Sequence, residues 1–142
     1  MTAVNRAHWQ ALAEERLVAA QALLAARQWS SAYYLAGYAV EFGLKSCILV
    51  HVANTGVIFK EKKFSEQCWS HNFKDLVNLA DLKLVLKADS AANPLLKRNW
   101  LVVGNWNETS RYEQKTQPEA EELFAAVTDN ANGVMPWIRL RW

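Results

Sequence analysis

The chain has 142 residues, of which 51% are hydrophobic and 21% charged, and its formal net charge is +2 at neutral pH. This length and composition indicate one globular domain over residues 1–142 and exclude a disordered or low-complexity chain. The small positive charge does not by itself indicate a nucleic-acid-binding protein.

Two antiparallel helices open the predicted fold. Apolar periodicity predicts the first over about residues 4–26, with an inner stripe made of Trp9, Ala13, Leu17, Ala20 and Leu24. The second follows a short connection at 27–29 and ends near Asn54-Thr55-Gly56, with Ser30 or Ser31 as its expected N-cap. A connection this short requires the two helices to lie antiparallel.

The second helix is predicted to be the central one, because residues 31–51 are apolar on nearly every face. Glu41 and Lys45 lie four residues apart, so they share a face and can pair. They interrupt the apolar run, whose uncharged stretches fall short of the ~20 residues that span a bilayer, so we expect no membrane segment. We interpret the two as a buried structural pair rather than a catalytic one.

Residues 57–70 lack clean periodicity and are predicted as a long loop that is either mobile or functional. The basic cluster Lys60–Lys63 within it either faces only solvent or meets phosphate. Asn72 is expected to begin a short helix, with a break near Ala80-Asp81 before the helical pattern resumes. Asn93-Pro94 then begins a helix that runs to about residue 105.

A polar loop is predicted over Gly104–Gln117, and a capping box at Thr116–Glu119 begins the last long helix. The buried face of that helix is predicted to consist of Ala120, Leu123, Phe124, Val127, Ala131 and Val134. An apolar tail follows, which is expected to dock on the bundle or on a partner and contains Trp137, Ile138, Leu140 and Trp142. The predicted fold is all-α: an up-and-down bundle of four to five helices, with a short extra helix and a long loop after the second helix.

The two cysteines form no CxxC motif, so no disulfide framework is predicted. The first ten residues contain no apolar segment, and we therefore expect no signal peptide. Together these features favour a cytoplasmic protein.

Four segments follow one another in a distinctive order: the helix YYLAGYAVEFGLKSCI, then His71–Leu76, then Trp100 and Trp106, and then Ser110-Arg111-Tyr112. Over roughly residues 9–130 this order resembles bacterial HEPN-domain proteins. In that family a helical hairpin carries a Glu-x-x-x-Lys pair, which would be Glu41 and Lys45 here, and an Arg-Tyr motif precedes the last helix.

The resemblance implies a helical homodimer with a link to RNA cleavage or nucleotide binding. Many HEPN proteins are ribonuclease toxins or defence nucleases, and others pair with a minimal nucleotidyltransferase antitoxin. The resemblance therefore implies a protein of the toxin–antitoxin type, with nucleotide, RNA or a nucleotidyltransferase as partner. We expect no cofactor.

Active ribonucleases of that family use an Arg-x(4–6)-His motif, in which His transfers a proton and Arg stabilises charge on the phosphate. His8, His51 and His71 have no arginine at that spacing before them, so the motif is absent. We therefore expect a module that binds nucleotide or RNA, or docks a nucleotidyltransferase, without cleaving. The alternatives are a divergent metal-independent ribonuclease that uses Arg111 and His71, and a purely structural dimer.

The expected ligand-binding residues are Arg111, Tyr112, His71, Trp106 and Glu108. Arg111 would face a phosphate, and Tyr112 would stack on a base. Each also has a structural interpretation: His71 orients the neighbouring loop through a hydrogen bond, Arg111 pairs with Glu41 or Glu108, and Tyr112 packs on the bundle.

A zinc site is a weak alternative. Cys47 and His51 lie four residues apart and Cys68 and His71 three apart, which is a permissible Cys2His2 set. Such spacings are common by chance, and a plain buried thiol is expected for Cys47 in its apolar helix. We therefore expect no metal.

Overall fold

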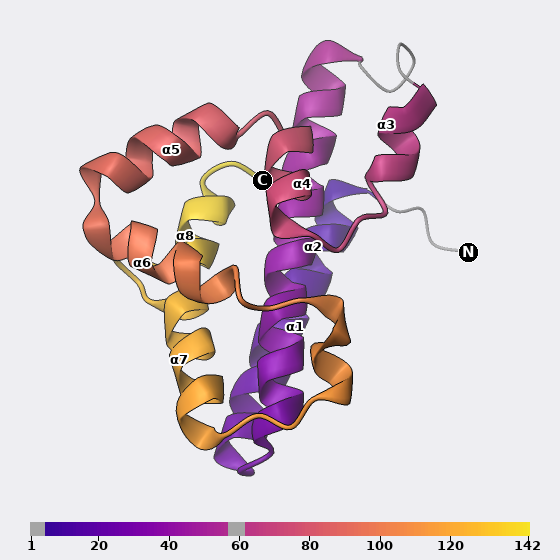
Figure 1. Cartoon of the computed structure of the whole chain (residues 1–142). Coiled ribbons are helices and arrows are strands. Elements are labelled where there is room, and N and C mark those ends of the chain that lie inside the picture. Colours follow the sequence, from indigo (N-terminus) through magenta and orange to yellow (C-terminus); the bar gives the residue numbers. More distant parts are fainter. Residues whose placement is uncertain (1–4, 57–61) are drawn as a thin grey trace.

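The computed structural model describes residues 5–56 and 62–142, and within 62–65 it describes only the side chain of Phe64. Its elements are α1 (Arg6–Ala25), α2 (Trp29–Thr55), α3 (Lys62–Gln67), α4 (Phe73–Leu79), α5 (Lys83–Ala92), α6 (Pro94–Val103), the 3-10 helix η2 (Glu108–Tyr112), α7 (Gln117–Thr128) and α8 (Val134–Arg139). These ranges contain no strand, so the all-α prediction is confirmed (Figure 1). The cluster Lys60–Lys63 lies outside the side chains that the structure describes.

The first two helices form the predicted antiparallel hairpin (Figure 1). The buried stripe of α1 is centred on Ala13, Leu17 and Ala20, as its spacing predicts. Gly56 ends α2 in the left-handed conformation, with φ of 64°. The predicted serine cap is wrong, because α2 already begins at Trp29 and the Ser30 hydroxyl instead accepts a hydrogen bond from the Lys115 amide at 2.8 Å.

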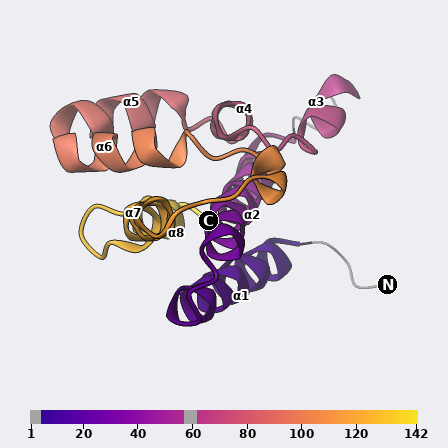
Figure 2. The ribbon, with the colours of Figure 1, turned by 60° about the horizontal axis from the view of Figure 1, so that its bottom comes forward.

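Helix α2 is the centre of the molecule. Figure 2 shows it with α1 on one side and with α4, α7 and α8 around the rest. Among the described residues it is the one helix long and apolar enough to cross a bilayer, yet 61% of its most apolar 18-residue window is buried inside the fold. The apolar faces of this helix are buried by neighbouring helices on several sides.

The middle of the chain folds as short helices with clear caps. The Asn72 side chain accepts the amide of Asp75 at the start of α4, and the Asn93 side chain accepts that of Leu96 at the start of α6, as predicted. Asp81, with φ of 58°, makes the predicted break before α5. Residues 62–67, which were expected to be loop, form α3 instead.

The predicted polar loop before α7 also contains regular structure. The Asn107 and Ser110 side chains form a reciprocal capping box that starts η2. The second predicted capping box, between Thr116 and Glu119, is confirmed at the start of α7.

The last predicted helix is in fact two helices. Helix α7 ends at Thr128, because Asp129 turns the chain and its carboxylate accepts the Asn132 amide at 2.8 Å. Ala131 is consequently exposed, so its predicted burial is wrong. Helix α8 begins at Val134 and docks on the bundle with Trp137 and Ile138 buried, which is one of the two positions expected for the tail, while Leu140 stays exposed.

Candidate functional site

A buried carboxylate lies at the middle of α2. Glu41 is 1% exposed and accepts a hydrogen bond from the Lys45 ammonium at 3.2 Å, so the predicted buried pair is confirmed. Its second oxygen lies 2.7 Å from Nδ1 of His71, the residue just before the N-cap of α4. The contact with His71 therefore ties α2 to the start of α4, while the contact with Lys45 lies within α2.

The ammonium of Lys45 is shielded from water by two aromatic rings. Its Nζ lies 5.4 Å from the ring centre of Trp9 on α1 and 5.8 Å from that of Trp69, which precedes α4. The π faces of tryptophan attract a cation and partly replace the water that burial removes. The structure thus shows a role for Trp9 and Trp69 that the sequence did not indicate.

The imidazole of His71 lies between two carboxylates. Its Nδ1 faces Glu41, and its Nε2 lies 3.1 Å from Oε2 of Glu108 on η2. The contact with Glu41 has the geometry of a hydrogen bond, and the contact with Glu108 lies within ion-pair distance. Each ring nitrogen therefore faces a carboxylate oxygen. The structural interpretation of His71, that it orients its loop, agrees with this geometry.

A pocket of about 490 Å³ opens beside His71. It lies between the loop before α4, the end of α6 and the start of η2, and it is lined by Ser70, His71, Asn72, Phe73, Lys74, Gly104, Trp106, Asn107 and Glu108. Its polar edge contains both acidic and basic groups. The predicted ligand-binding residues His71, Trp106 and Glu108 therefore come together, although they are distant in sequence.

Trp106 is mainly a core residue. It is 4% exposed, and its ring stacks on Phe73 with a centroid distance of 5.2 Å and an interplanar angle of 9°. Its other side lies against Gly37 of α2, where a β-carbon would overlap the indole. Its indole N–H has no partner among the described residues. Trp106 thus forms a wall of the pocket and has little free surface for a ligand.

Two tyrosines connect this pocket to η2. Tyr38 packs edge-on against Trp106 at 5.2 Å and against the His71 ring at 6.3 Å, and Tyr34 packs against Tyr38 at 4.8 Å. Burial, then the hydrogen bond with Tyr34, then the charge of Glu41 raise the pKa of Tyr38 well above its usual value. Tyr38 therefore stays a neutral phenol, and its place on the Glu41 face of α2 is the signal that could have identified it.

Arg111 and Tyr112 lie at the surface. The Arg111 guanidinium is 4.7 Å from the ring centre of Tyr112, and the neighbouring Tyr112 and Tyr34 side chains raise the pKa of Arg111. Glu41 has Lys45 and His71 as its partners, so the alternative in which Arg111 neutralises it is wrong. Tyr112 is 76% exposed, so the expectation that it packs on the bundle is also wrong.

The four residues of the weak zinc set do not converge. Burial raises the pKa of the Cys47 thiol to about 12, and its Sγ lies 3.9 Å from the carbonyl oxygen of Ile138. His51 packs near Phe64, while His71 belongs to the carboxylate cluster. Within residues 5–56 and 62–142, apart from the undescribed side chains, no three His, Cys, Asp or Glu residues are grouped to hold a metal.

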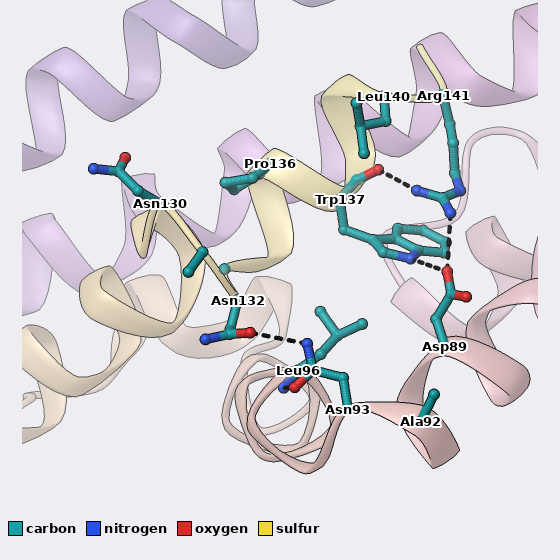
Figure 3. A pocket seen from close by; sticks show the side chains of 12 residues that line it. Asp89, Ala92, Asn93, Leu96, Asn130, Asn132, Pro136, Trp137, Leu140 and Arg141 are labelled. Atoms are coloured by element: carbon teal, nitrogen blue, oxygen red, sulfur yellow. Dashed lines mark hydrogen bonds and ion pairs between the residues drawn. The ribbon is translucent and has the colours of Figure 1, made fainter.

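A second pocket, of about 530 Å³, lies between α5, the turn after α7, and α8 (Figure 3). There the Asp89 carboxylate accepts the indole N–H of Trp137 at 2.8 Å and the guanidinium of Arg141 at 2.9 Å. Arg141 also lies 3.9 Å from the ring centre of Trp137. These charged groups are paired with one another, so they fasten the C-terminal tail to α5.

Comparison of the chain with protein-family models, with curated proteins and with solved structures finds no match. Any functional conclusion therefore depends on the residues of this chain and on the site they form.

Proposed function

We propose that this protein is a HEPN-like helical module that binds single-stranded RNA or nucleotide through Arg111 and Tyr112 without cleaving it. The main support for the absence of cleavage is the environment of His71, whose two ring nitrogens each face a carboxylate. A proton acceptor for RNA cleavage needs a free ring nitrogen beside the ribose hydroxyl. The absence of an Arg-x(4–6)-His motif supports the same conclusion.

Arg111 and Tyr112 have the chemistry that single-stranded RNA requires. An exposed guanidinium binds phosphate oxygens, and an exposed tyrosine ring is a platform on which a base stacks. No carboxylate of the described residues forms an ion pair with Arg111, so its charge is available to a ligand.

The test is a mobility shift with a labelled single-stranded RNA panel at several salt concentrations. Arg111→Ala and Tyr112→Ala should each weaken binding, and Arg111→Ala should also lower the slope of log affinity against log salt by about 0.7. Arg98→Ala is the matched control, because Arg98 is an exposed arginine of α6 that also forms no ion pair with the residues that the structure describes. Equal losses of RNA affinity in the two arginine variants would show that RNA is attracted only by the overall positive charge, and would contradict the proposal.

A divergent ribonuclease is the second candidate, and one observation favours it. A buried Glu41 oxygen 2.7 Å from Nδ1 is an arrangement that orients a histidine for proton transfer. Glu108, which blocks Nε2, is largely exposed and is free to move away. In this case Glu108→Ala should raise RNA cleavage, and adding His71→Ala should abolish it. Absence of cleavage in Glu108→Ala would reject the candidate.

The proposal includes a homodimer in the cytoplasm, with a nucleotidyltransferase as the protein partner. Sedimentation velocity should give twice the chain mass at micromolar concentration. A monomer at every practical concentration would contradict the dimer. Co-purification with a nucleotidyltransferase encoded next to this gene tests the partner.

A further inference from the structure

A second groove lies where α4, α5 and α6 meet, next to the His71 pocket, with which it shares Phe73, Lys74 and Gly104. Its volume is about 540 Å³, which is in the range of roughly 300–1,000 Å³ typical of small-molecule sites. Residues of all three helices line it: on α5 these are Lys83, Leu86 and Ser90, and on α6 they are Lys97, Trp100 and Leu101, followed by the C-cap residue Gly104. Figure 1 shows α5 and α6 as a pair at the side of the molecule farthest from α1.

The wall of this groove is apolar and partly uncovered. Its apolar side chains are Phe73 and Val77 of α4, Leu86 of α5, and Trp100 and Leu101 of α6. Leu101 is 65% exposed and lies in the last turn of α6. Phe73 and Val77 belong to the buried core, whereas Leu86 and Trp100 are partly buried, so Leu101 is the most exposed apolar side chain of the lining.

The charged side chains that line the groove are mostly basic. Each of the three helices contributes one lysine to it: Lys74, Lys83 and Lys97. None of the three forms an ion pair with the described residues. The one carboxylate in the lining is Asp75, which already accepts a hydrogen bond from the Ser70 hydroxyl at 3.2 Å. The groove therefore pairs an apolar wall with an excess of unpaired ammonium groups.

We propose that this groove is a binding site for a small amphipathic anion, of the class of free medium-chain fatty acids. The alkyl chain would lie along Trp100 and Leu101, which would remove apolar surface from water. The carboxylate would remain at the lysines, whose ammonium groups can approach an anion while their stems cover apolar surface. A free carboxylate of this size fits the volume of the groove, and its charge is complementary to the three lysines.

The test is isothermal titration calorimetry of the whole protein with dodecanoate below its micelle concentration. Dodecanol and dodecyltrimethylammonium are the neutral and cationic comparisons. Dodecanoate should bind at least tenfold more tightly than either. Equal binding of the three compounds would leave only an unspecific apolar surface and would overturn the proposal, as would no binding of dodecanoate.

Three variants locate the site. Lys83→Gln/Lys97→Gln should weaken dodecanoate binding about tenfold and leave dodecanol unchanged, because surface charges contribute modestly and the fold does not depend on them. Leu101→Glu should abolish binding of dodecanoate. Lys87→Gln is the matched control on α5, since Lys87 is exposed and lies outside the lining. An effect of Lys87→Gln equal to that of the double variant would overturn the assignment.

Self-association is the competing outcome. If a second copy of this chain covered the groove, sedimentation would show a dimer that Leu101→Glu converts to a monomer, and dodecanoate would not bind at concentrations that favour the dimer. That result would overturn the fatty-acid proposal. RNA binding through Arg111 should be the same in all of these variants, so the two proposals can fail separately.

Discussion

The substitution Glu41→Gln isolates the charge of the buried cluster. It keeps the size and shape of the side chain, so it creates no cavity, and it removes the negative charge between Lys45 and His71. Glu41 and Lys45 are both buried, whereas His71 keeps a second carboxylate in Glu108. The main consequence is therefore a buried ammonium without a counter-ion.

Removing one partner of a buried ion pair typically lowers stability by about 3–5 kcal/mol. The lower end applies here for two reasons. The Lys45 ammonium keeps the ring faces of Trp9 and Trp69, and the glutamine oxygen can still accept one hydrogen bond from it. We expect a loss of about 3 kcal/mol, which for a chain of this length lowers the melting temperature by about 10 °C.

Urea unfolding followed by circular dichroism measures this loss, and Glu108→Gln is the matched control. It makes the same chemical change at the exposed carboxylate of the His71 contact and should lower stability by less than about 1 kcal/mol. Lys45→Met, combined with Glu41→Gln, should restore at least about 1 kcal/mol relative to the sum of the single changes. A loss below about 0.5 kcal/mol in Glu41→Gln would refute the reasoning, since the pair would then stabilise the fold no more than a solvent-exposed ion pair does.

Four further predictions test the packing of the fold. Gly37→Ala should lower stability by about 1–3 kcal/mol despite the better helix propensity of alanine, because the new methyl group overlaps Trp106; an increase in urea midpoint would show that the indole moves aside freely. The Cys47 thiol, with its pKa raised to about 12 by burial, should resist alkylation at pH 8 until the protein unfolds. This thiol ionises more readily in the unfolded chain, so its contribution to the free energy of unfolding is complete below about pH 9 and is lost as the pH rises toward 12. A stability that increased over that range would contradict this prediction. Asp89→Ala leaves the indole N–H of Trp137 without its acceptor and should lower stability by about 1–2 kcal/mol, whereas an unchanged midpoint would show that water replaces the carboxylate.

The helix starts were largely predictable because they depend on neighbouring residues. Asn93 with Pro94, and Thr116 with Glu119, satisfy their own helix ends, and no distant contact is needed. Ser30 failed as a cap because a residue 85 positions away uses its hydroxyl. Helix α3 was missed because its six residues lack a recognisable apolar stripe.

The site was predictable only in part. The Glu41–Lys45 pair follows from the spacing of one helix, but the contact of His71 with Glu41 joins residues 30 positions apart and depends on how α4 packs on α2. The burial of Trp106 likewise depends on Gly37, whose missing side chain makes room for the indole. Sequence pattern therefore identified which residues carry charge, while tertiary packing decided which of them meet.

The most direct test of the proposed function is one incubation of the wild-type protein with end-labelled single-stranded RNA. Fluorescence anisotropy would report binding, and a denaturing gel of the same samples would report cleavage. The account predicts saturable binding that weakens in Arg111→Ala, with the RNA intact at the end of the incubation. Cleavage by the wild type that disappears in His71→Ala would contradict it and would make the Glu41–His71 pair catalytic.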